Sequence, residues 1–547
     1  MESTDPRDQI IAELRVENAA RLVGGEIPAV PAFTEWNSEL RDAVTRRLIP
    51  AVFPRCAWFQ TAGRTVREYR LAHVATLMPA VWLLIVEVNF QDGQPENYVL
   101  PIARLEGESE TSLTAAHPHA VLARIDGGGV LVDALYVPEV RERWLRLHLQ
   151  QETAAHFPPR PILPVEPGAV ARCAGGSRVV EMERANTSIA FGDTVLLKVY
   201  RRLEQGLHPE VELLEVLQRS GFPATPPIYS ALSLASPEGA AVLSSLSGYV
   251  AHQGDGWTFT IDALSRYFDR ALESRRDPAG TDVSEIIGGV FPERMRALGQ
   301  GIAALHRALA GQTGSGLAAE PFGALYQRSL YQAMRGQAGR VLRLLRKAPP
   351  HLPEADRALA ARVAGEEPAI LRVFSVLLND RFAAAKTRVH GDLHLGQILN
   401  TGKEFVFIDF EGEAGRPLGE RALKRCPLVD LASMLRSLDY AAWITQRREA
   451  EGDRETLRPW AALWVQAVTR TLVSEYFAAT AGATFLPATD AERDALLGVF
   501  VLDRALRELG HELTHHGEFS GEFIGVPLAA VTDLLTAKDR APSGSEP

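Results

Sequence analysis

The sequence is poor in cysteine and contains no long apolar run. Its 547 residues include three cysteines, Cys56, Cys173 and Cys426, which lie far apart along the chain. This odd and widely spaced set excludes a disulfide framework and a cysteine-rich zinc cluster, and it suits a reducing compartment. The longest apolar run, Leu77–Val86, has ten residues, which is too short to cross a bilayer.

An excess of positive charge is also absent. Lys and Arg number 58 against 68 Asp and Glu, so the net charge is −10, and neither nucleic acid nor an anionic membrane surface is an expected partner. The first residues, Met1–Asp8, lack the basic start and apolar stretch of a secretory signal. We therefore predict a cytoplasmic protein without membrane contact. The apolar share of 46% and the charged share of 23% are typical of a globular chain.

The residue patterns predict an α+β protein built from several parts. Short apolar or alternating segments such as Val81–Val88 and Val130–Leu135 indicate strands. The proline-rich stretch Phe157–Gly168 indicates a stiff connector, and from about Ser265 the chain is mainly helical. We expect a β-rich N-terminal cap (1–106), an intermediate α+β subdomain (107–253), a large helical part (254–540) and a disordered tail (541–547).

A hairpin followed by a helix is expected within the intermediate subdomain. Val179–Arg184 and Thr194–Tyr200 are predicted strands that flank Asn186–Ser188 and the turn Gly192-Asp193. A helix begins at Pro209, because proline is favoured at the first helical position.

The strongest chemical signal is the segment Arg388–Asn400, which is followed by the apolar strand Phe405–Phe410. Phosphoryl transfer from ATP needs a carboxylate beside the attacking hydroxyl and oxygen ligands for Mg²⁺. Asp392, in a tight loop, can orient and deprotonate the hydroxyl. Gln397 and Asp409, which follow it, can supply a neutral and a charged oxygen to the metal. The segment thus contains the set of groups that a kinase-like site requires.

This segment resembles a known catalytic loop. His390-Gly-Asp-Leu-His394 with a following amide residue is similar to the loop of aminoglycoside phosphotransferase-like kinases, and the version ending in Gln397 resembles the maltokinase family. The resemblance extends from about Trp58 to the C-terminus, and several blocks carry it: Glu183–Ser188, Leu197–Gly206, Pro209–Glu212, Gln253–Thr260, Asp409–Arg421 and Pro427–Ala442.

The resemblance implies a bilobal protein-kinase-like fold, with ATP expected between the nucleotide-binding lobe (107–253) and the helical lobe (254–540), which carries the catalytic loop. Lys198, in a predicted strand, would contact the α and β phosphates, and Glu212 on the next helix would orient it by ion pairing. Glu215, one turn further on, is the nearest competitor for that role. The sequence has no P-loop, and Asn186, Thr187 and Ser188 would replace a glycine-rich loop over the phosphates.

Further polar residues are candidates for binding the sugar acceptor, although some of them could equally be ordinary polar positions within helices. They are Glu411, Arg436, Asp439, Tyr440, Glu508 and Glu512. The last of these belongs to a His-Glu-x-x-His pattern, His511–His515, which would suit a zinc metalloprotease helix. Because the same helix overlays a maltokinase helix, and no third zinc ligand follows, we interpret the pattern as coincidental.

The resemblance implies an ATP- and Mg²⁺-dependent maltokinase that converts maltose to maltose 1-phosphate in trehalose and glycogen metabolism, and it suggests a trehalose synthase as a partner. Family tyrosines correspond to Arg507 and His511 in this chain. A kinase of the same fold for another acceptor, such as glucosamine, is therefore the first alternative. The second is a non-catalytic nucleotide-binding subunit of trehalose synthase.

Overall fold

The fold is α+β, as predicted, and the chain forms two units. The computed structural model describes residues 27–540 apart from 60, 62–63, 153–156, 174–175, 181–185, 237–238, 315, 348–351, 353, 414–415 and 515–522. Unit 1 comprises the chain up to residue 215 with 226–251 and 414–418, and unit 2 comprises 216–225, 252–413 and the chain from 419 onward. The predicted tail, 541–547, lies outside the described residues. Within the described residues, no helix is both long and apolar enough to cross a membrane.

Unit 1 begins with a seven-stranded sheet. Its strands are antiparallel apart from the β1–β5 pair, which is parallel. The strand order is β1 (Ala29–Val30), β5 (Val121–Ile125), β6 (Val130–Asp133), β4 (Glu96–Leu105), β3 (Val81–Phe90) and β2 (Val66–Met78), and β11 (Arg202–Leu203) also pairs with β4. The predicted cap boundary at residue 106 therefore falls inside this sheet, because β5 and β6 follow it in the chain.

Strand β3 explains why the longest apolar run of the sequence lies here. Alternate side chains of a strand face opposite sides of the sheet. Trp82, Leu84 and Val86 belong to a core that also contains residues of α2 (Ser38–Ala43) and α3 (Ile49–Val52). The residues between them, Val81, Leu83 and Ile85, belong to a second core. Both faces of β3 are therefore buried, so the strand is apolar throughout instead of alternating with polar residues.

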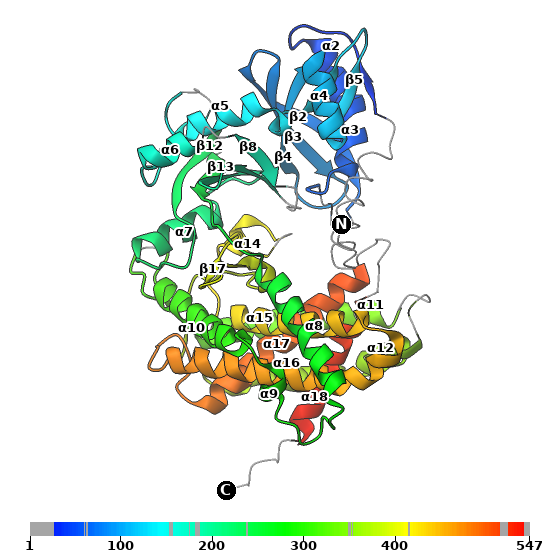
Figure 1. Ribbon diagram of the computed structural model, residues 1–547, viewed down its shortest axis with the longest axis vertical. Coiled ribbons are helices and arrows are strands. Elements are labelled where there is room, and N and C mark those ends of the chain that lie inside the picture. The colour runs from blue at the N-terminus through cyan, green and yellow to red at the C-terminus, as the bar shows by residue number, and fades with distance from the viewer. Residues whose placement is uncertain are drawn as a thin grey trace. The chain divides into compact units, whose positions relative to one another are not determined.

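The second core is shared with a six-stranded antiparallel sheet, and α5 (Pro138–His148) contacts its strands β12 and β13 (Figure 1). The strand order is β7 (Pro159–Pro161), β12 (Ile228–Ser236), β13 (Gly239–Gly248), β10 (Val195–Tyr200), β9 (Asn186–Phe191) and β8 (Ser177–Val180). The remaining helical segments of this part are π-helix η1 (Val44–Leu48), η2 (Phe53–Arg55), α4 (Glu108–Ala116), η3 (Pro118–Ala120), η4 (Ala134–Tyr136), α6 (Pro167–Cys173) and α7 (Pro209–Arg219), which ends in unit 2.

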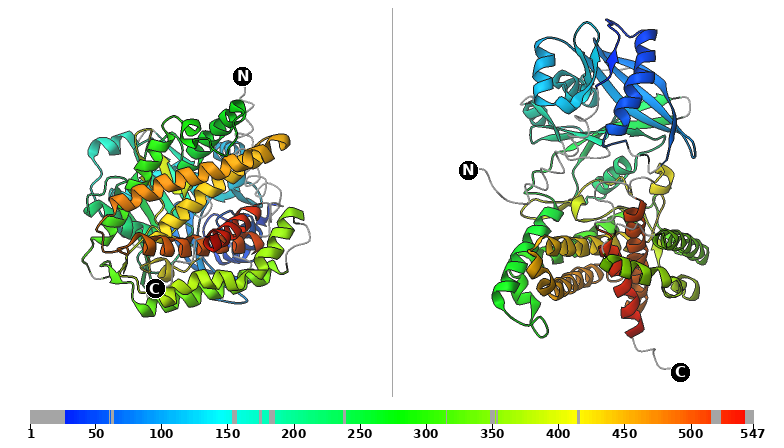
Figure 2. Two further views of the ribbon diagram at one scale, coloured as in Figure 1. Left: turned by 90° about the horizontal axis from the view of Figure 1, so that it is seen from below. Right: turned by 90° about the vertical axis from the view of Figure 1, so that its right-hand side faces the viewer.

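Unit 2 is mainly helical, as the sequence predicts. Its long helices α10, α15 and α16 lie side by side, and α17 packs on α15 (Figure 2). Tyr267, Trp460 and Trp464 are buried where these helices meet, and the Tyr267 hydroxyl donates to the Trp460 carbonyl at 3.0 Å. The helices are α8 (Gly256–Ser274), α9 (Val283–Ile287), α10 (Phe291–Ala310), α11 (Ala324–Leu345), α12 (Glu354–Gly365), α13 (Glu367–Asn379), η5 (Leu395–Gln397), α14 (Leu418–Arg421), α15 (Leu428–Arg448), α16 (Glu451–Ala479), α17 (Asp490–Thr514) and α18 (Gly525–Arg540).

Four short strands of unit 2 form two hairpin-like pairs. Strands β14 (Glu320–Pro321) and β15 (Ala385–Lys386) make one pair, and β16 (Ile398–Asn400) and β17 (Phe405–Phe407) make the other. The second pair lies directly after the predicted catalytic loop, and α8 packs closely on it, since a Cβ on Gly256 would come within 2.4 Å of the Ile398 side chain. This contact fixes the end of the loop segment against the helix.

Candidate active site

Lys198 lies in unit 1 on the face of β10 that points away from the core. Its neighbours Leu197 and Val199 face the core, so alternation puts the Lys198 side chain on the opposite face. The Nζ atom lies 3.3 Å from an oxygen of Glu210 on α7, and both side chains are about 9% exposed. The Tyr200 hydroxyl donates to the second oxygen of Glu210 at 2.8 Å. A buried ion pair with this further hydrogen bond holds the ammonium in one place.

The partner of Lys198 is Glu210, whereas the sequence analysis assigns this contact to Glu212. In a helix, residues three or four apart share a face. Glu210 therefore shares a face with Leu213 and Leu214, which are buried, whereas Glu212 shares one with Glu215. Glu215, the predicted competitor, pairs with Arg160 at 2.9 Å. The helical phase thus selects the carboxylate that contacts Lys198.

The predicted phosphate-covering loop is a strand. Asn186, Thr187 and Ser188 begin β9 and pair with β10, with Ser188 opposite Lys198. The Thr187 hydroxyl is buried and accepts from Arg201 Nε at 2.8 Å. The strand forms because this segment continues into the apolar end of β9, which belongs to the core. Residues 181–185, which precede β9, lie outside the described residues.

The catalytic-loop segment in unit 2 is held by a buried carboxylate. One oxygen of Asp430 on α15 accepts from the backbone amide of His390 and the other from that of Gly391, both at 2.8 Å. His306 contacts the same carboxylate at 3.2 Å. Burial opposes ionisation of Asp430, but the hydrogen bonds from His306 and Gly391 and the nearby His390 hold its pKa below its ordinary value. The loop is therefore anchored to α15 by an ionised side chain.

Two further features fix the turn that precedes Asp392. Gly391 has φ +87°, and a Cβ there would lie 3.3 Å from the Cα of Gly412, so a side chain would be both strained and crowded. The Nε2–H of His390 donates to the carbonyl of Ile408 at 2.9 Å. This bond ties the loop to the residue before Asp409.

Asp392 makes its printed contacts with one arginine and one histidine of unit 2. Its Oδ1 lies 3.2 Å from both terminal nitrogens of Arg504 on α17. Its Oδ2 lies 3.9 Å from Nε2 of His394. Burial lowers the pKa of His394, and the neighbouring Asp392 opposes this shift only in part. The carboxylate is thus held through one oxygen.

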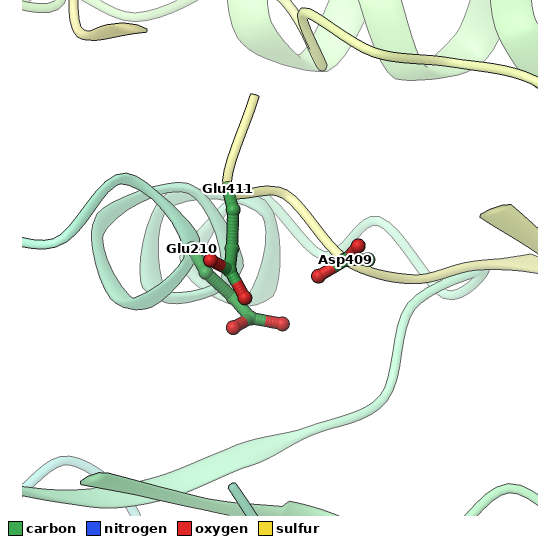
Figure 3. Close-up of side chains that lie close together, drawn as sticks. All are labelled: Glu210, Asp409 and Glu411. Atoms are coloured by element: carbon green, nitrogen blue, oxygen red, sulfur yellow. The ribbon is translucent and has the colours of Figure 1, made fainter. Parts of the chain in front are cut away.

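Gln397 and Asp409 lie next to each other, as the sequence analysis expects of a metal pair. Gln397 Nε2 donates to Asp409 Oδ2 at 2.9 Å. Asp409 has φ +63°, a left-handed conformation that is costly for a residue with a side chain and that concentrates at functional sites. Asp409 and Glu411 both lie on the segment after β17 (Figure 3). A carboxamide and a carboxylate in contact offer hard oxygen donors, so these two residues fit Mg²⁺.

Most of the predicted acceptor residues form one polar cluster on α15 and α17. Arg436 Nε donates to Glu508 at 2.9 Å, and Arg436 also pairs with Asp439. The guanidinium lies over the Tyr440 ring, 5.5 Å from its centroid. Glu508 in turn contacts Arg504 Nε at 3.3 Å. The cluster is therefore linked directly to the arginine that holds Asp392.

The remaining predicted residues are less well connected to this cluster. Glu512 lies on α17, where its charge contributes to raising the pKa of Tyr440 after the larger effects of burial and Glu508. His511 and Glu512 are described, but His515 of the His-Glu-x-x-His pattern and its neighbour His516 lie outside the described residues. The structure therefore adds nothing to the zinc alternative.

Sequence reasoning missed three residues of these sites: Glu210, Asp430 and Arg504. The phase of Leu213 and Leu214 on the predicted helix could have selected Glu210. Arg504 stands four residues before Glu508, the spacing of a helical ion pair. Asp430 had no local signal, because its partners lie 39 and 40 residues away in the chain.

Comparison with known proteins supports the kinase-like fold. Residues 280–464 match the model of the phosphotransferase enzyme family. The chain is 27% identical over 365 residues to a glucosamine kinase of Streptacidiphilus jiangxiensis, covering 66% of this chain and 74% of that protein. It is 26% identical over 270 residues to a glucosamine kinase of Mycolicibacterium smegmatis, covering 49% and 60%.

Among solved structures, a glucosamine kinase in complex with glucosamine, ADP and inorganic phosphate has the same fold. Its TM-score is 0.58 at 21% identity, and the match covers 92% of this chain and all of that one. The predicted α+β kinase-like fold is therefore confirmed. The named relatives are glucosamine kinases and not maltokinases, which corrects the resemblance on which the maltose prediction rests.

Proposed function

We propose that this chain is an ATP-dependent sugar kinase whose acceptor is glucosamine or a closely related amino sugar. The observation that carries the proposal is the loop of unit 2, where Asp430 anchors the turn before Asp392 and Gln397 contacts Asp409. This loop lies within the segment that matches the phosphotransferase enzyme family. The curated relatives, both glucosamine kinases, support the choice of acceptor.

In this proposal Asp392 receives the proton of the acceptor hydroxyl as the hydroxyl attacks the γ-phosphate. Lys198 contacts the nucleotide phosphates, and Glu210 keeps its ammonium oriented. Gln397 and Asp409 would hold Mg²⁺, which when bound neutralises charge on the phosphates. Catalysis of this kind depends mainly on positioning and on charge stabilisation.

The charges of unit 2 around Arg504, Arg507 and Tyr440 favour a cationic acceptor. Acidic side chains that act on these three groups outnumber the arginines. They are Asp392, Glu413, Asp503, Glu508 and Glu512, against Arg436, Arg504 and Arg507. An ammonium group on the sugar would gain charge-assisted hydrogen bonds in such surroundings.

A panel of acceptors tests the proposal. ATP consumption is measured with glucosamine, glucose, N-acetylglucosamine, maltose and an aminoglycoside, with Asp392→Asn as the matched control for background hydrolysis. Glucose differs from glucosamine only at the amino group, so we expect kcat/KM to be about 10²-fold higher for glucosamine. Equal values for the two sugars would contradict recognition of the ammonium.

The same panel decides between the other candidates. Turnover of maltose alone would favour the maltokinase prediction, and a trehalose synthase partner would then be the next question. Tight ATP binding without turnover of any acceptor would favour the non-catalytic subunit. Both outcomes would contradict an amino-sugar kinase.

A further inference from the structure

We propose that Arg504 is a positioning residue that fixes the carboxylate of Asp392 for the incoming hydroxyl. The inference deepens the proposed function and depends on it. Arg504 lies on α17, 112 residues from Asp392, and both of its terminal nitrogens lie 3.2 Å from the single oxygen Oδ1. The contact leaves Oδ2 as the oxygen available to an acceptor.

Arg504 is itself held on its other side. Its Nε lies 3.3 Å from Oε1 of Glu508, whose Oε2 accepts from Arg436 at 2.9 Å. Arg436 is buried, with a side chain only 3% exposed. A buried cation therefore anchors Glu508, Glu508 orients Arg504, and Arg504 orients Asp392.

The charge state of Arg504 suits this role. Burial opposes its charge, but Asp392, Glu508 and Glu413 together raise its pKa above the ordinary value. The side chain remains a cation whether or not an acceptor is bound. A planar guanidinium can keep two donors on one partner and a third on another, which a lysine cannot do.

Fixing the carboxylate matters because phosphoryl transfer depends on alignment. A misplacement of about 1 Å at a reacting group can cost roughly 10²-fold in rate. Asp392 follows a glycine turn and has no printed hydrogen bond other than those from Arg504 within the described chain. Without Arg504 its carboxylate would sample several rotamers.

The first test compares Arg504→Met with Arg493→Met, a matched change three turns earlier on α17, where Arg493 contacts the carbonyls of Pro487 and Ala488. For Arg504→Met we expect kcat with glucosamine to fall about 30- to 100-fold, with the KM for ATP changed less than about twofold. Arg493→Met should leave both near the values of the unaltered chain. Arg504→Lys should recover part of kcat, because one donor to Oδ1 is restored. No recovery would count against a positioning role.

The second test is a double-mutant cycle with Asp392→Asn. If Arg504 acts through Asp392, then Arg504→Met should cost less than about threefold in the Asp392→Asn background. The same 30- to 100-fold loss in both backgrounds would overturn the inference and indicate a structural role. Absence of turnover in the unaltered chain with every acceptor would instead overturn the proposed function.

Discussion

The two ion pairs described here, Lys198 with Glu210 in unit 1 and Asp392 with Arg504 in unit 2, are built differently. Lys198 stands on a strand, and its carboxylate partner is 12 residues away on the following helix. Asp392 stands in a loop, and its cationic partner is 112 residues away on a helix near the C-terminus. The first pair depends on local chain geometry and the second on how the helices of unit 2 pack. Substitutions should therefore affect them in different ways.

The largest effect is expected at Asp392. Asp392→Asn keeps the size of the side chain but removes the group that accepts the proton, so kcat should fall by about 10³-fold. The affinity for ATP should stay within about twofold, as measured by calorimetric titration. Activity close to that of the unaltered chain would remove Asp392 from the role of base.

The anchor of the loop is expected to contribute mainly to stability. Asp430→Asn leaves one buried backbone amide facing an amide NH₂, so the free energy of unfolding of unit 2 should fall by about 3 kcal/mol. Urea denaturation measures it, and Asp490→Asn, at an exposed position on α17, is the control and should change little.

The pH dependence of this loss has a defined sign. The folded pKa of Asp430 lies below its ordinary value of 3.8. Its contribution is therefore fully present above that value and is lost as the pH falls through the folded pKa. The difference between the unaltered chain and Asp430→Asn should be constant from pH 7 to 5 and should narrow below pH 4. A difference that narrows already between pH 7 and 5 would contradict this assignment.

In unit 1, the comparison of two glutamates sharpens the assignment of the lysine partner. Lys198→Met should lower kcat/KM for ATP about 10²-fold, since one phosphate contact is lost. Glu210→Gln should cost about tenfold, whereas Glu212→Gln should cost less than twofold. Steady-state kinetics with varied ATP decide the matter, and the opposite ranking of the two glutamates would restore the prediction made from the sequence.

The smallest effect is expected far from both ion pairs, at His148. Its ring nitrogens lie 2.8 Å from Ser230 Oγ and 2.9 Å from Ser244 Oγ, and burial lowers its pKa to about 3. The unfolded chain binds a proton near pH 6.5 that the folded chain does not, so stability falls as the pH decreases below 6.5. Between pH 6.5 and 5 the loss from this group should be about 2 kcal/mol.

Substitution isolates the contribution of this histidine. His148→Gln should make urea denaturation of unit 1 less dependent on pH over the same range by the uptake of one proton. An unchanged pH dependence would show that His148 is protonated in the folded chain.

Features set by residues close in sequence were predictable. The catalytic-loop segment, the strand before Asp409 and the helix at Pro209 all follow from short patterns, and the structure contains each of them. The contact between Gln397 and Asp409 was anticipated because only a tight β16–β17 pair separates them.

Features set by distant packing were not. Asn186–Ser188 reads as polar loop sequence, but the neighbouring strands β8 and β10 recruit it into the sheet. Local propensity is overridden in this way when cross-strand packing is available. Arg504 and Asp430 could be related to the loop only through the packing of α15 and α17, which no spacing in the sequence reveals.

Strand β11 has a practical consequence for shortening the chain. It pairs with β4 of the first sheet, and just before it Arg201 forms a buried ion pair with Asp133 at 2.5 Å. A truncated protein that starts after residue 106 would lose β2, β3 and β4, and would leave β11 as an unprotected sheet edge beside newly wetted apolar side chains. Such edges promote aggregation, so recombinant expression of this protein should retain the first sheet intact.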